Sequence, residues 1–189
     1  PIGESNGLTQ DCGLVLFVGR LANEKNIPRM IDAIDRVLAD RPNVLASLIG
    51  EGPMRKQLEE HIDAAPNGSR IRLQGFRHDV WAWMKRASAL VAVGHFEGDP
   101  NVALEAAACG CPLVLSNIDA YQTVFSERTA TFVDPKSPAS IARGLESVLD
   151  GFDNLNDQVE SARDIAHSRS MDSMVAAYVG IYHSALTGI

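Results

Sequence analysis

Short apolar runs alternate with amphipathic segments from residue 14 to about residue 150. The runs have the length of buried strands and contain many branched residues, which favour strand structure. We predict six strands from them: Leu14–Val18, Val44–Ile49, Ile71–Gly75, Ala89–Val93, Pro112–Leu115 and Thr131–Val133.

Between these runs, apolar residues recur every three or four positions, which is typical of a helix with one buried face. Proline at or near a first helical position marks several of the starts. We therefore predict helices that begin at Pro28, at Pro53, at Val80 with Asp79 as its cap, and at Pro100, Ala120 and Pro138, and two more at roughly 154–167 and 171–186.

Strands that alternate with helices predict an α/β fold with a parallel sheet covered on both faces. About six strands with right-handed crossovers indicate a doubly wound, Rossmann-like sheet. Residues 1–12 are polar and are predicted to be a linker, so that residues 13–189 form the domain and its C-terminal helices.

The composition is that of an ordinary globular protein, with 46% hydrophobic and 22% charged residues. A net charge of −7 without a basic stripe argues against nucleic acid as a partner. The sequence contains no apolar run of membrane-spanning length, and its three cysteines lack metal-site spacing. We expect buried thiols, a reduced compartment and a cytoplasmic protein.

The segment Val93–Pro112 joins a strand end, a glycine-bearing loop and a helix start. Asp99 is predicted to cap this helix, with Pro100 at its first position. Free backbone N–H groups and the positive end of the helix dipole favour an anionic ligand there. Two carboxylates flank the helix start, Glu97 in the loop and Glu105 in the helix.

Further candidates follow the carboxyl ends of the other strands, where doubly wound folds bind ligands. Arg20 and Lys25 suit a diphosphate clamp, although solvated loop charges are an alternative for both. Glycines in Gly50–Pro53 permit close approach of a ligand, or simply form a turn. The first strand is followed by no Gly-x-Gly-x-x-Gly sequence, which argues against a nicotinamide or flavin site.

The carboxylates also have simpler interpretations. Glu97 could bind sugar hydroxyls or be an exposed loop acid, and Glu105 could be a solvent-facing helical residue. His95 could serve as an acid or base, but a surface histidine without such a role is the simpler reading.

In this order and spacing, the motifs resemble the C-terminal, donor-binding domain of retaining GT-B glycosyltransferases of family 4. The resemblance rests on Phe17–Leu21 with Glu24–Lys25, on Gly50–Pro53, on Leu73–Phe76 and on Glu97–Asn101 running on to Glu105. The sequence departs from the family pattern at Asn26, where glycine is usual, at Gly94, where serine is common, and at Asp99, where an apolar residue is common.

The resemblance implies roles for individual residues in binding a nucleoside-diphosphate sugar. Arg20 and Lys25 would hold the diphosphate and Glu97 the donor sugar, and these three form the predicted catalytic set. Glu105 would meet the ribose. The remaining predicted donor contacts are Gly19, Gly50, Gly52, Gly75, Phe76, Gly98, Asp99, Pro100 and Asn101.

The resemblance further implies a sugar transfer that retains the anomeric configuration, without a cofactor and without a metal, because the sequence contains no Asp-x-Asp motif. The acceptor, a glycan or lipid-linked glycan, would bind an N-terminal domain that precedes this chain. We therefore expect this piece alone to bind donor without turnover, and that preceding domain could place the protein at a membrane surface. A non-catalytic nucleotide-binding domain and half of a sugar-nucleotide epimerase are the alternatives.

Overall fold

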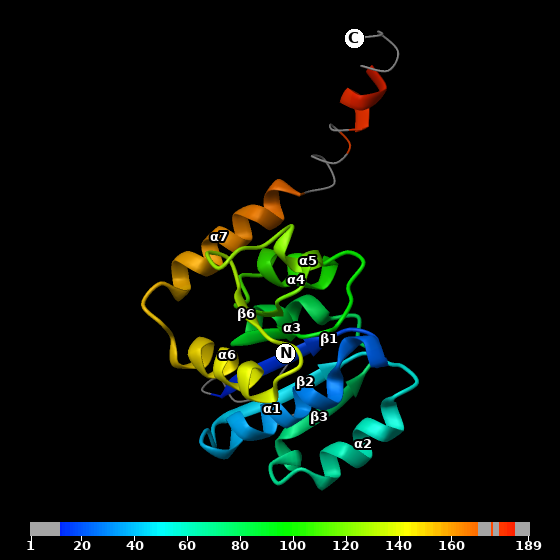
Figure 1. Cartoon of the computed structure of the whole chain (residues 1–189), viewed down its shortest axis with the longest axis vertical. Helices are drawn as coiled ribbons and strands as arrows, with labels where there is room; N and C mark the ends of the chain where they lie inside the picture. The colour runs from blue at the N-terminus through cyan, green and yellow to red at the C-terminus, as the bar shows by residue number, and fades with distance from the viewer. Residues whose placement is uncertain (1–11, 170–174, 176–177, 184–189) are drawn as a thin grey trace.

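Six parallel strands form one sheet within residues 12–169 (Figure 1). The computed structural model describes residues 12–169, 175 and 178–183. The sheet order is β3-β2-β1-β4-β5-β6, which confirms the doubly wound, Rossmann-like prediction. The strands are β1 (Gly13–Val18), β2 (Val44–Ile49), β3 (Ile71–Gly75), β4 (Ala89–Ala92), β5 (Leu113–Ser116) and β6 (Thr131–Val133).

The two faces of the sheet carry separate sets of helices, because successive strand side chains point to opposite faces. Val15 and Phe17 pack beneath α1 (Ile27–Ala39), α2 (Arg55–Ala64) and α6 (Pro138–Asp150). Leu14 and Leu16 pack on the other face. The helices there are α3 (Val80–Arg86), α4 (Asn101–Ala108), α5 (Asp119–Gln122) and α7 (Leu155–Ser168).

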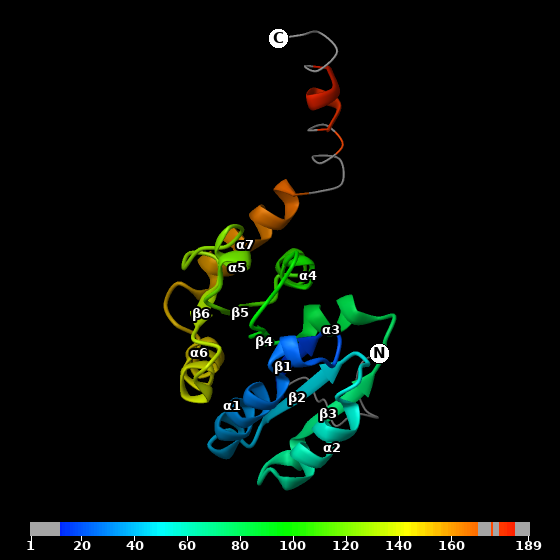
Figure 2. The same ribbon diagram turned by 45° about the vertical axis from the view of Figure 1, so that its right-hand side comes forward.

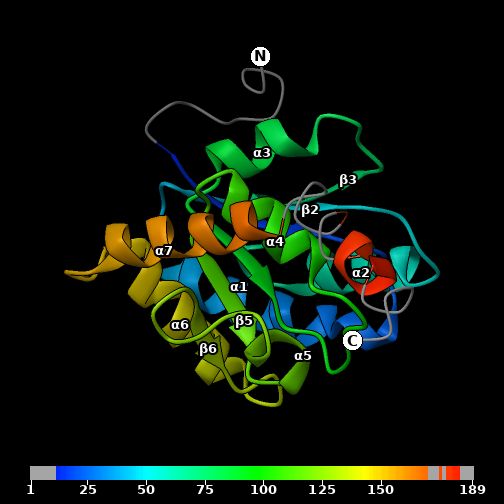
Figure 3. The ribbon, with the colours of Figure 1, turned by 90° about the horizontal axis from the view of Figure 1, so that it is seen from above.

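The figures show this layering from two further directions. In Figure 2, α1 and α6 lie on one side of the strands and α3 and α4 on the other. Seen from above, α7 runs alongside α4 (Figure 3), and these two helices are in contact. Both faces of the sheet are therefore covered, which explains why its strands read as continuous apolar runs.

Most element boundaries match the sequence prediction, but the start of α4 does not. The helix begins at Asn101, and Pro100 takes the capping position with φ −76° and ψ 39°. The prediction that Asp99 caps this helix is therefore wrong, because a non-helical Pro100 shifts the start by one residue. Asp99 lies exposed in the preceding loop.

Two other local predictions also need correction. The second helix begins at Arg55 rather than at Pro53, with Met54 as its cap. Asp79 does precede α3, but its side chain makes no capping bond and instead pairs with Arg77 at 2.7 Å.

Both ends of the chain extend past the described region. The predicted linker falls outside the described residues, apart from Cys12. The predicted last helix also lies largely outside them, although residues 178–183 are helical and exposed.

Candidate functional site

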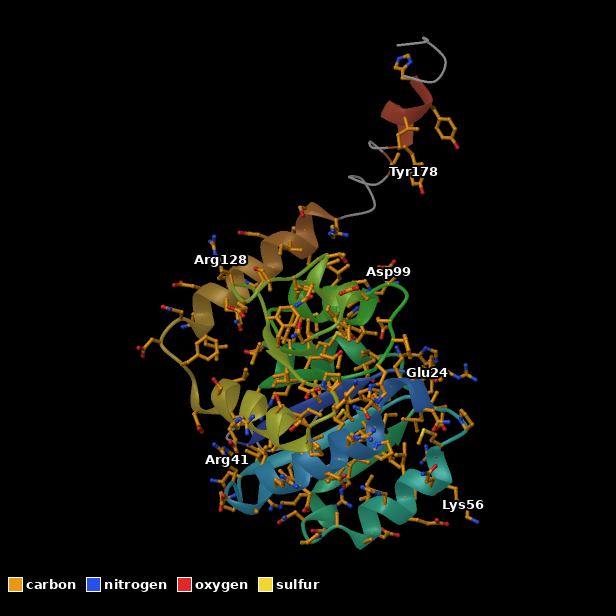
Figure 4. The ribbon with its side chains drawn as sticks, viewed as in Figure 1. Glu24, Arg41, Lys56, Asp99, Arg128 and Tyr178 are labelled. Carbon is orange, nitrogen blue, oxygen red and sulfur yellow. The ribbon has the colours of Figure 1, made fainter. Side chains whose placement is uncertain are left out.

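The candidate residues gather where β1 and β4, the two central strands, end side by side. On one side of β1 lie β2 and then β3, and on the other side lie β4, β5 and β6. The helices that follow these two strands, α1 and α4, pack on opposite faces of the sheet, and doubly wound folds place a ligand crevice at such a switch point. Glu24 and Asp99, from these two loops, are labelled on the same side of the molecule in Figure 4.

Main-chain hydrogen bonds join the loops that follow β1, β2 and β3. The N–H of Gly19 donates to the carbonyl of Ile49 at 3.0 Å, and the N–H of Gly50 donates to the carbonyl of Gly75 at 2.9 Å. The N–H of Leu21 donates to the backbone carbonyl of Glu51 at 3.0 Å. These bonds use backbone groups alone and join the three loops into one wall of the crevice.

Gly50 and Gly52 allow this close approach of loops. A Cβ at Gly50 would lie 1.9 Å from the carbonyl oxygen of Gly19, and the Gly50 φ of 141° is itself unfavourable for other residues. A Cβ at Gly52 would lie 2.3 Å from the carbonyl oxygen of Leu21. The group that comes close to each of these glycines is therefore the backbone of a neighbouring loop and not a ligand. The glycines shape the wall of the predicted donor site.

A cleft of about 280 Å³ opens between these loops and the start of α3. Its lining is mostly apolar, with Arg20, Glu51 and Arg77 as the charged residues; the other lining residues are Val18, Gly19, Ile49, Gly50, Phe76 and Val80. The ring of Phe76 is 69% exposed and meets His78 edge-on with centroids 4.9 Å apart. A flat apolar ring beside an apolar cleft suits the face of a heterocyclic base.

Lys25 and Glu97 form an ion pair across the switch point. The Lys25 ammonium donates to both carboxylate oxygens of Glu97, at 2.8 Å and 2.7 Å. Only 23% of the lysine side chain and 16% of the glutamate side chain are exposed. The structure therefore brings together two residues that lie 72 positions apart and that the sequence assigned to one site.

Tyr121, at the end of α5, is a third member of this cluster that sequence reasoning missed. Its side chain is buried, and its hydroxyl donates to Glu97 Oε2 at 3.5 Å. Burial raises the pKa of this phenol, and the nearby Glu97 carboxylate raises it further. Tyr121 thus stays protonated and offers Glu97 a neutral hydrogen-bond donor.

Asn26 holds the lysine-bearing loop in place. It takes the left-handed conformation, with φ 56°, which explains why glycine is usual here. Its buried amide nitrogen donates to the carbonyl of Val93 at 3.1 Å and to that of Pro135 at 2.7 Å. The loop after β1 is therefore tied both to the end of β4 and to the loop after β6.

The close packing of these loops also explains the glycine at position 94. The backbone N–H of His95 donates to the carbonyl of Glu24 at 2.9 Å. A Cβ at Gly94 would lie 2.9 Å from the same carbonyl oxygen. The backbone of Gly94 and His95 thus packs against the loop after β1.

Most of the remaining predicted residues are exposed, either around the start of α4 or on the loop after β1. Gly98, Asp99 and Asn101 are exposed around the start of α4, where Pro100 is buried. Glu105 is exposed on α4, four residues after Asn101, and Arg20 is exposed on the loop after β1. Backbone N–H groups at the start of α4 complete an edge with positive potential.

The described residues offer neither a metal-binding cluster nor a membrane-spanning helix. No cluster of three or more histidine, cysteine, aspartate or glutamate residues there is placed to hold a metal ion. None of the helices in that part of the chain has the length and apolarity needed to cross a membrane.

The profile of the family described as "Glycosyl transferases group 1" matches residues 2–165. The chain belongs to the group 1 glycosyl transferases. Its family membership and its fold, one half of a GT-B arrangement, thus agree with the resemblance seen in the motifs.

Similar proteins from this family extend beyond the present chain. An uncharacterized glycosyltransferase of Methanocaldococcus jannaschii is 31% identical over 186 residues, covering 96% of this chain and 47% of that protein. Glycogen synthase of Mycobacterium tuberculosis is 35% identical over 142 residues, covering 72% of this chain and 34% of its own length. The chain thus spans about half or less of these relatives.

Among solved structures, HepE of Anabaena in complex with UDP superimposes with a TM-score of 0.82 at 20% identity. The match covers 93% of this chain and 49% of that protein. At this identity the likeness supports the fold alone.

Proposed function

We propose that this group 1 glycosyl transferase chain binds the donor, a nucleoside-diphosphate sugar, for a retaining sugar transfer. The observation that carries the proposal is the pairing of Lys25 with Glu97 at the switch point. A cation for a diphosphate and a carboxylate for sugar hydroxyls stand next to each other, beside a cleft of a size and polarity suited to a base.

The donor would lie across the ends of the central strands. Its base would enter the cleft beside Phe76, and its diphosphate would meet Lys25, Arg20 and the N–H groups near Gly98 and Asn101. Glu97 would accept hydrogen bonds from sugar hydroxyls, and Glu105 from the ribose. HepE of Anabaena, which has a similar fold, was solved in complex with UDP, and this supports a nucleotide as a ligand of the fold.

In the proposed reaction the acceptor hydroxyl attacks the anomeric carbon on the face that the diphosphate leaves. The bond between that carbon and the phosphate oxygen breaks as the bond to the acceptor oxygen forms. The acceptor's proton passes to an oxygen of the departing diphosphate, so that charge and atoms balance. Lys25 and Arg20 stabilise the negative charge that grows on the leaving group.

We further propose that the acceptor, a glycan or lipid-linked glycan, is held by protein outside this chain. The described strands all belong to the one sheet that forms the donor site, and the match covers 47% of the archaeal relative. Residues 1–189 would then bind donor without transferring sugar at a measurable rate. Transfer should appear when the remainder of the natural protein is present.

Calorimetry with UDP, GDP and ADP, and with their glucose or mannose conjugates, tests the donor proposal directly. We expect one of these nucleotides to bind residues 1–189, and to bind equally well with and without EDTA, because side chains and a helix N-terminus meet the diphosphate charge. Binding that disappears in EDTA would contradict the metal-free proposal. Absence of binding by all of them would contradict the donor assignment.

A further inference from the structure

Lys25 and Glu97 would contact different halves of the proposed donor, yet the two side chains contact each other. Both Glu97 oxygens accept from the Lys25 ammonium, and both side chains are largely buried. In this ion pair the Lys25 ammonium donates to a carboxylate, and both Glu97 oxygens accept a hydrogen bond. A ligand that enters the site must therefore change the partners of both groups.

A bare nucleoside diphosphate satisfies one of the two groups. Its phosphate oxygens attract Lys25, whose amine is a compact charge on a flexible stem. Glu97 then loses its cation while a new anion arrives beside it, and it keeps the hydrogen bond from the Tyr121 hydroxyl at 3.5 Å. A carboxylate that is largely buried and short of donors raises the free energy of that complex.

A complete sugar nucleotide satisfies both groups. Its diphosphate takes Lys25, and its sugar hydroxyls donate to Glu97 in place of the ammonium. The neutral phenol of Tyr121 keeps a donor facing Oε2 throughout, because burial and the adjacent carboxylate hold it protonated. With the sugar nucleotide, Lys25 and Glu97 both gain new partners. With the diphosphate that remains after transfer, Lys25 gains a partner but Glu97 does not.

We propose that the Lys25–Glu97 pair makes the site select a complete sugar nucleotide over a bare nucleoside diphosphate. Glu97 competes with the diphosphate for Lys25 until sugar hydroxyls replace the ammonium. The same competition favours release of the diphosphate product. This inference rests on the proposed function and adds to it a basis for discrimination between donor and product.

The substitution Glu97→Gln tests the inference, because it removes the competing charge and preserves the shape of the side chain. We expect this variant to bind the nucleoside diphosphate about fivefold more tightly than the wild type, the size of a partly buried ion pair. We expect the matching sugar nucleotide to bind more weakly. Calorimetry with UDP and UDP-glucose, and with GDP and GDP-mannose, measures both changes on the full 189-residue chain.

Glu24→Gln is the matched control for simple charge repulsion. Glu24 lies next to Lys25 on the same loop and is exposed, so this variant removes the same charge near the crevice without releasing the ammonium. A second control uses Lys25→Met, in which the added Glu97→Gln substitution should no longer give the fivefold gain. Thermal melting of each variant verifies that it is folded.

The outcomes separate the two proposals. If Glu97→Gln gains no more affinity for the diphosphate than Glu24→Gln, or gains it equally in the Lys25→Met background, the inference is wrong and the donor proposal stands. If the wild type binds neither diphosphates nor sugar nucleotides, the donor proposal is wrong and the inference falls with it.

Discussion

Arg20 and Lys25 leave the same strand but stand in different surroundings. Arg20 is exposed at the edge of the cleft beside Phe76, whereas the Lys25 side chain is largely buried against Glu97. Charged hydrogen bonds to phosphate supply more affinity than neutral ones. Removal of either cation should therefore affect the diphosphate part of the ligand specifically.

Arg20→Ala and Lys25→Ala should each weaken binding of the nucleoside diphosphate by about 1.5–3 kcal/mol, the range for hydrogen bonds to charged groups. The lysine variant should lie toward the lower end, because in the wild type the diphosphate must first draw Lys25 away from Glu97. Calorimetry measures this, with the corresponding nucleoside as control ligand. Equal losses for nucleoside and diphosphate would indicate a folding defect and contradict the assigned role.

The buried thiol of Cys111 should lower the stability of the fold at alkaline pH. Its side chain is buried between α4 and β5, and desolvation raises the pKa of its thiol to about 12. In the unfolded chain the thiol ionises near its ordinary value, so above about pH 9 the unfolded state binds fewer protons than the folded state. Stability contributed by this group is therefore complete below about pH 8.5 and falls as the pH rises toward 12.

Urea unfolding of the wild type and of Cys111→Ala at pH 8, 9, 10 and 11 checks this. The wild type should lose up to about 1.4 kcal/mol more per pH unit than the variant above pH 9. Tyr121, whose pKa is also raised, titrates in both proteins and cancels from the difference. Parallel pH profiles for the two proteins would show that the buried thiol does not carry the effect.

At the scale of elements, α6 packs on the sheet through a glycine. A Cβ at Gly144 would lie 2.4 Å from Val133 Cγ1 and 3.4 Å from Val114 Cγ1. The absence of a side chain at this position lets the helix approach β5 and β6 closely. For a substitution of Gly144 by alanine, helix propensity therefore predicts higher stability and packing predicts lower stability.

Gly144→Ala should destabilise the domain by about 1–2 kcal/mol, because overpacking of about 1–3 kcal/mol outweighs a propensity gain of up to about 1 kcal/mol. Ser147→Ala, at an exposed position of the same helix, is the matched control and should gain a few tenths of a kcal/mol. Chemical denaturation measures both variants. A Gly144→Ala protein as stable as the wild type would mean that the helix moves away at little cost.

The elements were predictable where one local rule decided them. Leu14–Val18 and Val44–Ile49 are buried on both sides, so an unbroken apolar run was sufficient evidence for a strand. Ser137 caps α6 as its sequence indicates, accepting from the N–H of Ser140. The cap rule failed at Asp99 because Pro100 adopts a non-helical ψ and delays the start of α4.

The sequence placed Lys25 and Glu97 at one edge of the sheet but did not predict their contact. The parallel sheet by itself implied that residues following different strands would meet at one edge. The pairing of Lys25 with Glu97 also required β1 to lie beside β4, which depends on the strand order of the whole sheet. Tyr121 and the amide of Asn26 gave no local signal, since their partners lie 24 to 109 residues away.

At the scale of the whole molecule, the ligand crevice lies over the junction between two groups of strands. The register of β1 with β2 spans six residue pairs, from Gly13 to Val18, whereas that of β1 with β4 spans two, Val15 with Ala89 and Leu16 with Leu90. Asn26 and His95 add further hydrogen bonds between loops on the two sides of this junction. Lys25 and Glu97 thus come from opposite sides of it.

The backbone bonds among the loops after β1, β2 and β3 have a consequence for how such a protein diversifies. Those bonds do not depend on side-chain identity, whereas Arg20, Glu51 and Phe76 project from the loops that they hold. These three side chains can therefore be exchanged, and with them the chemistry of the cleft, while the cleft keeps its shape. Glycine has to be kept at positions 50 and 52, which gives a protein designer a fixed frame with three adjustable positions.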